Sequence, residues 1–182
     1  MHLPAREQGE SRIGVSIAVP EPYAAELVAA RRRAGDQYAA VIPPHVTLVG
    51  PTVVDSLAAV EDHLAVVAAA ATPFRLHLRG TGTFRPISPV VFINVVQGIA
   101  ECEQLERRAR RGPLAQDLRF NYHPHVTIAH EVSSLSLERT FNQMSTFEAA
   151  FTVEEFWLYE HGNDDVWRPR RSFPLGLGGL FP

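Results

Sequence analysis

The sequence contains no lysine and a single cysteine, and both shortages narrow the possible functions. Arginine supplies all 17 basic residues, against 20 acidic residues, which leaves a formal net charge of −3. A chain with this balance lacks the broad positive surface that proteins binding long nucleic acids usually carry. With Cys102 alone, neither an intramolecular disulfide nor a cysteine-based metal cluster can form.

Long apolar runs are missing as well. No stretch approaches the roughly 18 apolar residues that a transmembrane helix requires. The first 12 residues also lack the apolar core of a secretory signal. We therefore expect a soluble cytoplasmic protein without a membrane partner. Nothing in the sequence implies an obligate protein partner, and the oligomeric state is left open.

The remaining composition is that of an ordinary globular domain. The chain has 182 residues, of which 46% are hydrophobic, and this length is enough for one sizeable core. We predict a single domain over residues 13–175. A flexible tail of residues 1–12 is expected before it, and a glycine-rich tail of residues 176–182 after it.

The predicted domain divides into two halves, residues 13–85 and 86–175, that repeat one order of elements. Each half reads as strand, helix, strand, helix, strand. The strands are expected at 13–19, 41–49, 74–78, 90–96, 125–132 and 151–159, with a last extended segment within 164–173, and the helices at 22–35, 56–72, 99–111 and 136–147. This order indicates a duplicated unit of about 80 residues, which is too long a period and too few copies for a solenoid.

A pentapeptide recurs at equivalent positions of the two halves. Residues 44–48 read Pro-His-Val-Thr-Leu, and residues 124–128 read Pro-His-Val-Thr-Ile. On a strand, successive side chains point to opposite faces, so the His and Thr of each copy share one face. The apolar residues of each copy then anchor the strand in the core. The sequence therefore predicts two polar pairs that face each other across one site.

The residue types in these pairs suit phosphodiester chemistry. An imidazole has a pKa near neutrality, so one of His45 and His125 can act as a base while the other acts as an acid. The hydroxyls of Thr47 and Thr127 can donate to the non-bridging oxygens of a phosphate. This scheme needs neither a metal nor a cofactor, and none is expected.

The two motifs resemble those of the 2H phosphoesterase superfamily, which is defined by two His-x-Thr/Ser-x motifs. Motif spacing and chain length are similar to the branch named for 2′-5′ RNA ligase, which includes RNA 2′,3′-cyclic phosphodiesterases. The resemblance implies an α+β fold with two pseudo-symmetric lobes, each an antiparallel sheet with helices outside and the active site in the cleft between. It also implies that His45 and His125 are the acid/base pair and that Thr47 and Thr127 bind phosphate.

The sequence departs from the branch at one position. Related proteins often carry arginine five residues after the second motif histidine, where this chain has His130. The departure limits any inference of a long RNA substrate. We therefore expect a metal-independent phosphodiesterase that opens a 2′,3′-cyclic phosphate on a nucleotide or RNA end, with reversible 2′-5′ RNA ligation as a related activity.

Two other functions remain open at this point. The first is a phosphodiesterase that acts on a small cyclic or 2′-5′ linked nucleotide, which the near-neutral charge favours. The second is a non-catalytic RNA-binding module that retains the cleft. A comparison of a cyclic mononucleotide with a cyclic-phosphate-ended oligomer separates the enzymes, and RNA binding without turnover would indicate the module.

Further candidate contacts with a substrate are less specific. Phe120 and Tyr122 precede the second motif and can stack on a nucleobase, although core packing is the alternative. Arg85 can reach a phosphate from the loop between the halves, although a solvated arginine is the alternative. Trp157 and Trp167 are expected to serve packing.

A metal site is a further chemical alternative, because His123, His125 and His130 lie close together in the sequence. On an ideal strand, however, His130 faces away from His125. The chain also lacks a helical His-Glu-x-x-His motif. No metal site is therefore expected.

Overall fold

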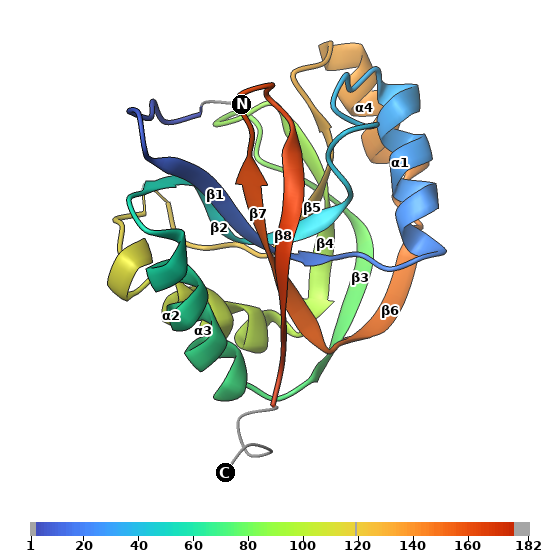
Figure 1. Cartoon of the computed structure of the whole chain (residues 1–182). Helices are drawn as coiled ribbons and strands as arrows, with labels where there is room; N and C mark the ends of the chain where they lie inside the picture. The colour runs from blue at the N-terminus through green and yellow to red at the C-terminus, as the bar shows by residue number, and fades with distance from the viewer. Residues whose placement is uncertain (1–2, 119, 177–182) are drawn as a thin grey trace.

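Alternating apolar residues build eight strands that join into one curled, fully antiparallel sheet (Figure 1). The computed structural model describes residues 3–118 and 120–176, so all but one residue of the expected C-terminal tail lie outside the described residues. The strands are β1 (Ser11–Ala18), β2 (His45–Val54), β3 (Phe74–Thr83), β4 (Val90–Gln97), β5 (His125–His130), β6 (Glu148–Val153), β7 (Glu155–His161) and β8 (Trp167–Pro174). Their order across the sheet is β6-β3-β4-β5-β2-β1-β7-β8.

Within the described residues, four α-helices cover the sheet in two pairs: α1 (Tyr23–Ala34), α2 (Leu57–Ala69), α3 (Ile99–Ala109) and α4 (Ser134–Gln143). Serine side chains cap α2 and α4, since Ser56 and Ser133 each accept a hydrogen bond from a backbone N–H of the first turn. Gly35 ends α1 at a φ of 83°, a left-handed conformation that costs glycine little. In Figure 1, α1 and α4 lie together on one side, and α2 and α3 on the other.

The two halves of the sheet meet at its centre, where β2 pairs with β5. Strands β6, β3, β4 and β5 form one half, and β2, β1, β7 and β8 form the other. Each half is covered by helices, with α1 packed against β5 and α3 against β2. The predicted α+β fold with two pseudo-symmetric lobes is therefore confirmed.

The lobes do not coincide with the sequence halves 13–85 and 86–175. Strand β3 comes from the first half of the chain but pairs with β4 and β6. Strands β7 and β8 come from the second half but extend the sheet beside β1. One core of buried apolar side chains includes residues from both halves of the chain.

Several predicted strands differ from the structure in their bounds, and two of these differences have a clear physical reason. The segment 151–159 is two strands, because the chain leaves β6 at Glu154 and continues as β7 beside β1. Figure 1 shows the two strands meeting at the bottom of the molecule, where the curled sheet brings its halves together. The first motif strand begins at His45 rather than at Val41, because Pro43 and Pro44 have no N–H to give to a ladder.

Part of the expected N-terminal tail packs on the sheet. Ser11 and Arg12 already belong to β1. The Arg12 side chain donates to the carbonyl oxygen of Pro4 from Nε at 2.9 Å, and Arg6 donates to that of His161 at 2.7 Å. Over the described ranges, no helix combines the length and the apolar character needed to cross a bilayer.

Candidate active site

The register of the two central strands brings the motifs together. Val46 of β2 is paired with Val126 of β5, and both side chains are fully buried. Because the strands are antiparallel, this pairing places His45 opposite Thr127 and Thr47 opposite His125. The histidines therefore lie on a diagonal, and so do the threonines. The remaining apolar motif residues, Leu48 and Ile128, are at most 3% exposed and anchor the strands in the core.

All four polar motif residues line one cavity of about 180 Å³. We call it the motif cavity. Its other lining residues are Arg31, Asp36, Tyr38, Ile42, Pro44 and His130. The structure thus places the four sequence-predicted residues in a common space, although the two motifs are separated by 80 positions.

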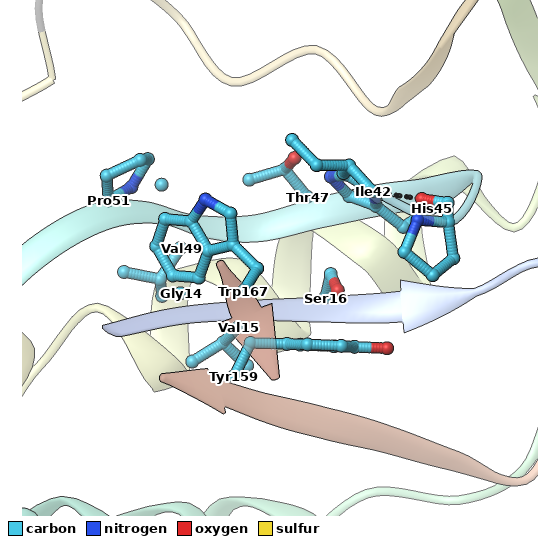
Figure 2. A pocket seen from close by; sticks show the side chains of 12 residues that line it. Gly14, Val15, Ser16, Ile42, His45, Thr47, Val49, Pro51, Tyr159 and Trp167 are labelled. Atoms are coloured by element: carbon cyan, nitrogen blue, oxygen red, sulfur yellow. Dashed lines mark hydrogen bonds between the residues drawn. The ribbon is translucent and has the colours of Figure 1, made fainter. Parts of the chain in front are cut away.

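Both motif histidines are oriented by a hydrogen bond to the backbone carbonyl oxygen of the residue two positions earlier. Nδ1 of His45 lies 2.7 Å from the carbonyl oxygen of Pro43, drawn as the dashed line in Figure 2, and Nδ1 of His125 lies 2.6 Å from that of His123. A carbonyl oxygen only accepts, so Nδ1 carries the proton in each ring. In the neutral ring, Nε2 is then the nitrogen that can take a proton from a substrate.

The surroundings favour the neutral form of both imidazoles. Burial lowers the pKa of His45, the Arg31 guanidinium lowers it further, and the hydrogen bond to Pro43 acts in the opposite direction. Burial likewise lowers the pKa of His125, with smaller lowering by the charges of His123 and His45. The two sites differ because only His45 is influenced by a permanent cation.

The threonine hydroxyls have unused hydrogen-bonding capacity. Within residues 3–118 and 120–176, neither Thr47 nor Thr127 makes a side-chain hydrogen bond. Neither hydroxyl is fully buried without a partner, so each can reach a ligand in the motif cavity. Two such donors facing two imidazoles form a suitable frame for an anion.

Arg31 is a site residue that the sequence did not single out. Its Nε donates to Asp36 at 2.8 Å, and both side chains are under 8% exposed. Arg31 also donates to the carbonyl oxygen of Ile42, in the loop that leads into the first motif. In the sequence Arg31 opens a run of three arginines, and only the tertiary structure distinguishes it from its exposed neighbours Arg32 and Arg33.

His130 faces the motif cavity, contrary to the parity expected for an ideal strand. The ladder between β4 and β5 pairs Val91 with Ala129 and Phe92 with Thr127, so Ile128 is skipped as a bulge. A bulge inserts one extra residue and reverses the faces of all later residues. His130 therefore returns to the face of His125. Even so, no group of three His, Cys, Asp or Glu side chains within the described ranges is arranged to hold a metal ion.

The less specific candidates lie elsewhere. Arg85, Phe120 and Tyr122 do not line the motif cavity. Tyr122 instead donates from its hydroxyl to the carbonyl oxygen of Thr47 at 2.9 Å, and burial raises its pKa, so it remains a donor. Tyr122 thus ties the segment before the second motif to the strand of the first. Phe120 is 59% exposed.

Known proteins resemble this chain in sequence and in fold. A Bacillus cytotoxicus protein named "putative phosphoesterase" is 28% identical over 151 residues, which cover 81% of this chain and 87% of the relative. Escherichia coli LigT, solved with NADP+, has a TM-score of 0.59 at 22% identity and covers 92% of this chain and 99% of its own. Thermus thermophilus TT0787 has a TM-score of 0.58 at 22% identity, and the match covers 91% of this chain and 98% of TT0787.

The family itself is established by a match over most of the sequence. The model of the 2′-5′ RNA ligase superfamily matches residues 19–165, a range that includes both motifs and all four helices. The predicted relationship is therefore confirmed, and the family together with the similar proteins indicates a phosphoesterase. This chain belongs to the 2′-5′ RNA ligase superfamily.

Proposed function

We propose that this protein hydrolyses a 2′,3′-cyclic phosphate on a nucleotide or RNA end, without a metal ion, by two-histidine acid/base catalysis. The crossed arrangement of His45 opposite Thr127 and Thr47 opposite His125 within one cavity is the observation that carries the proposal. Structures of LigT hold 3′-AMP, NADP+, phosphate and ATP. Each of these ligands contains phosphate, which supports a phosphate-containing substrate for this protein.

The proposed step balances with water as the only co-reactant. One imidazole accepts a proton from water at Nε2 while the water oxygen forms a bond to phosphorus. The bond from phosphorus to one ribose oxygen breaks, and the other histidine protonates that oxygen. The product is a phosphate monoester on the remaining ribose oxygen. The diagonal placement of the histidines suits attack and departure on opposite sides of phosphorus.

The threonines and Arg31 stabilise the charge that builds up on the phosphate. The Thr47 and Thr127 hydroxyls donate to the two non-bridging oxygens, one from each motif strand. Arg31, which also lines the cavity, adds a permanent positive charge and is held in place by Asp36 and the Ile42 carbonyl. The same groups support reversible 2′-5′ ligation, in which a ribose 5′-hydroxyl replaces water.

Turnover assays test this function directly. Purified protein is incubated with adenosine 2′,3′-cyclic phosphate and with an oligoribonucleotide that ends in a 2′,3′-cyclic phosphate, and monoester products are separated by chromatography. We expect hydrolysis of both, with a higher kcat/KM for the mononucleotide because the chain carries a net charge of −3. Absence of turnover with either substrate, in protein that binds RNA, would instead support the non-catalytic module.

A ligation assay tests the second activity. An oligomer with a 2′,3′-cyclic phosphate is mixed with one bearing a 5′-hydroxyl, and the joined product is digested with a nuclease specific for 3′-5′ linkages. Ligation by this site predicts a joined product that resists digestion at the junction and that is absent when His45 or His125 is replaced by alanine. A junction that is cut would contradict 2′-5′ ligation.

A further inference from the structure

A second hollow adjoins the motif cavity on one side only. Its volume is about 110 Å³, and it shares His45 and Thr47 with the motif cavity. We call it the aromatic pocket, after Tyr159 of β7 and Trp167 of β8. Figure 2 shows the Trp167 ring next to Gly14 and Val49, and the Tyr159 ring on the side of β1 away from Thr47.

Small residues open this hollow, and larger ones fill the equivalent space in the other lobe. Ser16 of β1 pairs with Thr47, whereas Phe92 of β4 pairs with Thr127. The Phe92 ring is only 4% exposed and packs against His125, with ring centroids 5.0 Å apart. A Cβ added at Gly82 would collide with this ring, so the space is fully taken.

The position five residues after each motif histidine shows the same asymmetry. It is Gly50 after His45 and His130 after His125. Gly50 lines the aromatic pocket, and a Cβ built there meets no atom within 4 Å. The pseudo-twofold relation between the lobes therefore breaks down where a substrate's substituents would lie. One side of the motif cavity is open to a bulky group, and the other is closed.

The aromatic pocket also contains two hydrogen-bond donors without an acceptor among the described residues. Trp157 donates from its indole N–H to Glu155 at 3.1 Å, but the indole N–H of Trp167 has no partner within the described ranges. The Tyr159 hydroxyl likewise has none there, and burial raises its pKa, so it keeps its proton. Neither atom is sealed from solvent. Half-buried Trp and Tyr usually find a partner for these groups.

Flat aromatic walls with free donors at their edges fit one class of ligand. A nucleobase is planar, stacks on aromatic side chains, and presents hydrogen-bond acceptors along its edge. A nucleobase in the aromatic pocket would have its ribose and phosphate beside His45 and Thr47, because these two residues line both the aromatic pocket and the motif cavity. The Trp167 ring is held for such a contact, because it packs on His161 at a centroid distance of 4.8 Å and lies over Gly14.

We propose that the aromatic pocket binds the nucleobase of the substrate, with the base against Trp167 and its edge within reach of the Tyr159 hydroxyl. This inference rests on the proposed function, since it gives that site a nucleoside substrate and a fixed orientation. If the inference holds, the enzyme binds the nucleobase and prefers substrates that carry one. A site that contacts only the cyclic phosphate would accept base-free substrates equally well.

The test compares substrates with and without a base. The kcat/KM is measured for adenosine 2′,3′-cyclic phosphate and for 1-O-methylribose 2′,3′-cyclic phosphate. In Trp167→Ala, we expect kcat/KM for the nucleotide to fall about tenfold to a hundredfold, as loss of a base-stacking residue typically causes. The base-free substrate should change less than twofold. Equal losses on both substrates, or no loss on the nucleotide, would overturn the proposal.

Two further variants keep the test independent of folding defects. Gly50→Leu fills the pocket without removing Trp167, at a position where an added side chain has room. It should lose the preference for the nucleotide in the same way. Trp157→Leu is the matched control, because Trp157 lines neither hollow, and it should retain that preference. A Gly50→Leu protein with unchanged preference would place the base elsewhere.

Direct binding separates this inference from the reaction itself. Equilibrium dialysis with adenosine 3′-phosphate and with inorganic phosphate needs no turnover. If no cyclic phosphate is hydrolysed but adenosine 3′-phosphate binds and Trp167→Ala weakens only its binding, the pocket stands and the proposed reaction fails. If hydrolysis occurs and Trp167→Ala binds both ligands like the parent, the reaction stands and the pocket fails.

Discussion

Val46 of β2 lies directly opposite Val126 of β5, and this one pair determines the geometry of the site. Each valine separates the His and Thr of its own motif, so the antiparallel pairing crosses the two motifs. A register shift by one residue would turn one motif's polar pair into the core. The buried valines therefore specify which groups meet in the cavity.

Replacing either motif histidine by alanine should remove most of the turnover. We expect kcat to fall about 10²- to 10⁴-fold in His45→Ala and in His125→Ala, the range for loss of a general acid or base. Thermal unfolding should show that both variants remain folded. The control His77→Ala removes a histidine that pairs with Glu148 outside the motif cavity, and it should keep parental kinetics. Full activity in either motif variant would end the two-histidine mechanism.

Removing a threonine hydroxyl should weaken transition-state binding while preserving the fold. Thr47→Val and Thr127→Val keep the side-chain shape, and each should lose about 2–4 kcal/mol of transition-state stabilisation, as when one oxyanion donor is removed. The loss is calculated from kcat/KM. The matched variants Thr47→Ser and Thr127→Ser retain a hydroxyl and should stay near the parent. A change under twofold in the valine variants would mean that the hydroxyls do not touch the phosphate.

The pH dependence of kcat/KM should be bell-shaped with an optimum on the acidic side. The base must be neutral and the acid protonated, so activity falls below one pKa and above the other. Burial lowers the pKa of both His45 and His125 from 6.5. The alkaline limb should therefore begin below pH 6.5, in initial rates measured across a constant-ionic-strength buffer series. An activity that keeps rising above pH 8 would contradict this assignment.

The same two pKa shifts predict how stability depends on pH. In the unfolded chain each histidine binds a proton near pH 6.5, whereas in the folded protein it does so only at a lower pH. The unfolded state therefore binds more protons below pH 6.5, and the stability contributed by the neutral histidines is lost as the pH falls. Denaturant unfolding of the parent and His45→Ala at pH 8 and pH 5.5 should show a smaller drop in the variant.

Removing the charge of Arg31 should move one limb of the pH profile and leave the other in place. Arg31 lowers the pKa of His45 but does not contribute to that of His125. We expect the double variant Arg31→Gln/Asp36→Asn, which avoids an uncompensated buried carboxylate, to shift a single limb to higher pH. The control Arg32→Gln removes the charge of an exposed neighbour on the same helix and should leave both limbs unchanged. The limb that moves identifies the role of His45, and movement of both limbs would refute a specific effect.

Chelation should leave the reaction intact. The proposed mechanism moves protons between imidazoles, water and ribose oxygens, so no step calls on a metal ion. Protein dialysed against EDTA should keep its kcat/KM for a cyclic mononucleotide within twofold of the untreated sample. Loss of activity that added zinc restores would revive a metal site around His123, His125 and His130.

Much of the site could be predicted from local sequence. The alternation of polar and apolar residues in Pro-His-Val-Thr places His45 beside Thr47 on one strand face, and this depends only on strand geometry. The repeat at residues 124–128 indicates a second copy of the same unit. Helix ends such as Ser56 and Gly35 follow from capping chemistry within a few residues.

The tertiary structure decided what depends on contacts between distant residues. The bulge at Ile128 turns the side chain of His130 toward the motif cavity. Helix α1 packs against β5 and thereby places Arg31 in the lining of the same cavity. The hollow beside Trp167 exists because small residues stand where the other lobe has Phe92. The sequence by itself determined the reacting groups, since strand alternation is local. Only the fold decided how the two motif strands are paired, which charged residues lie beside them, and why one side of the motif cavity is open and the other closed. These features arise from hydrogen bonding and packing between segments far apart in the chain.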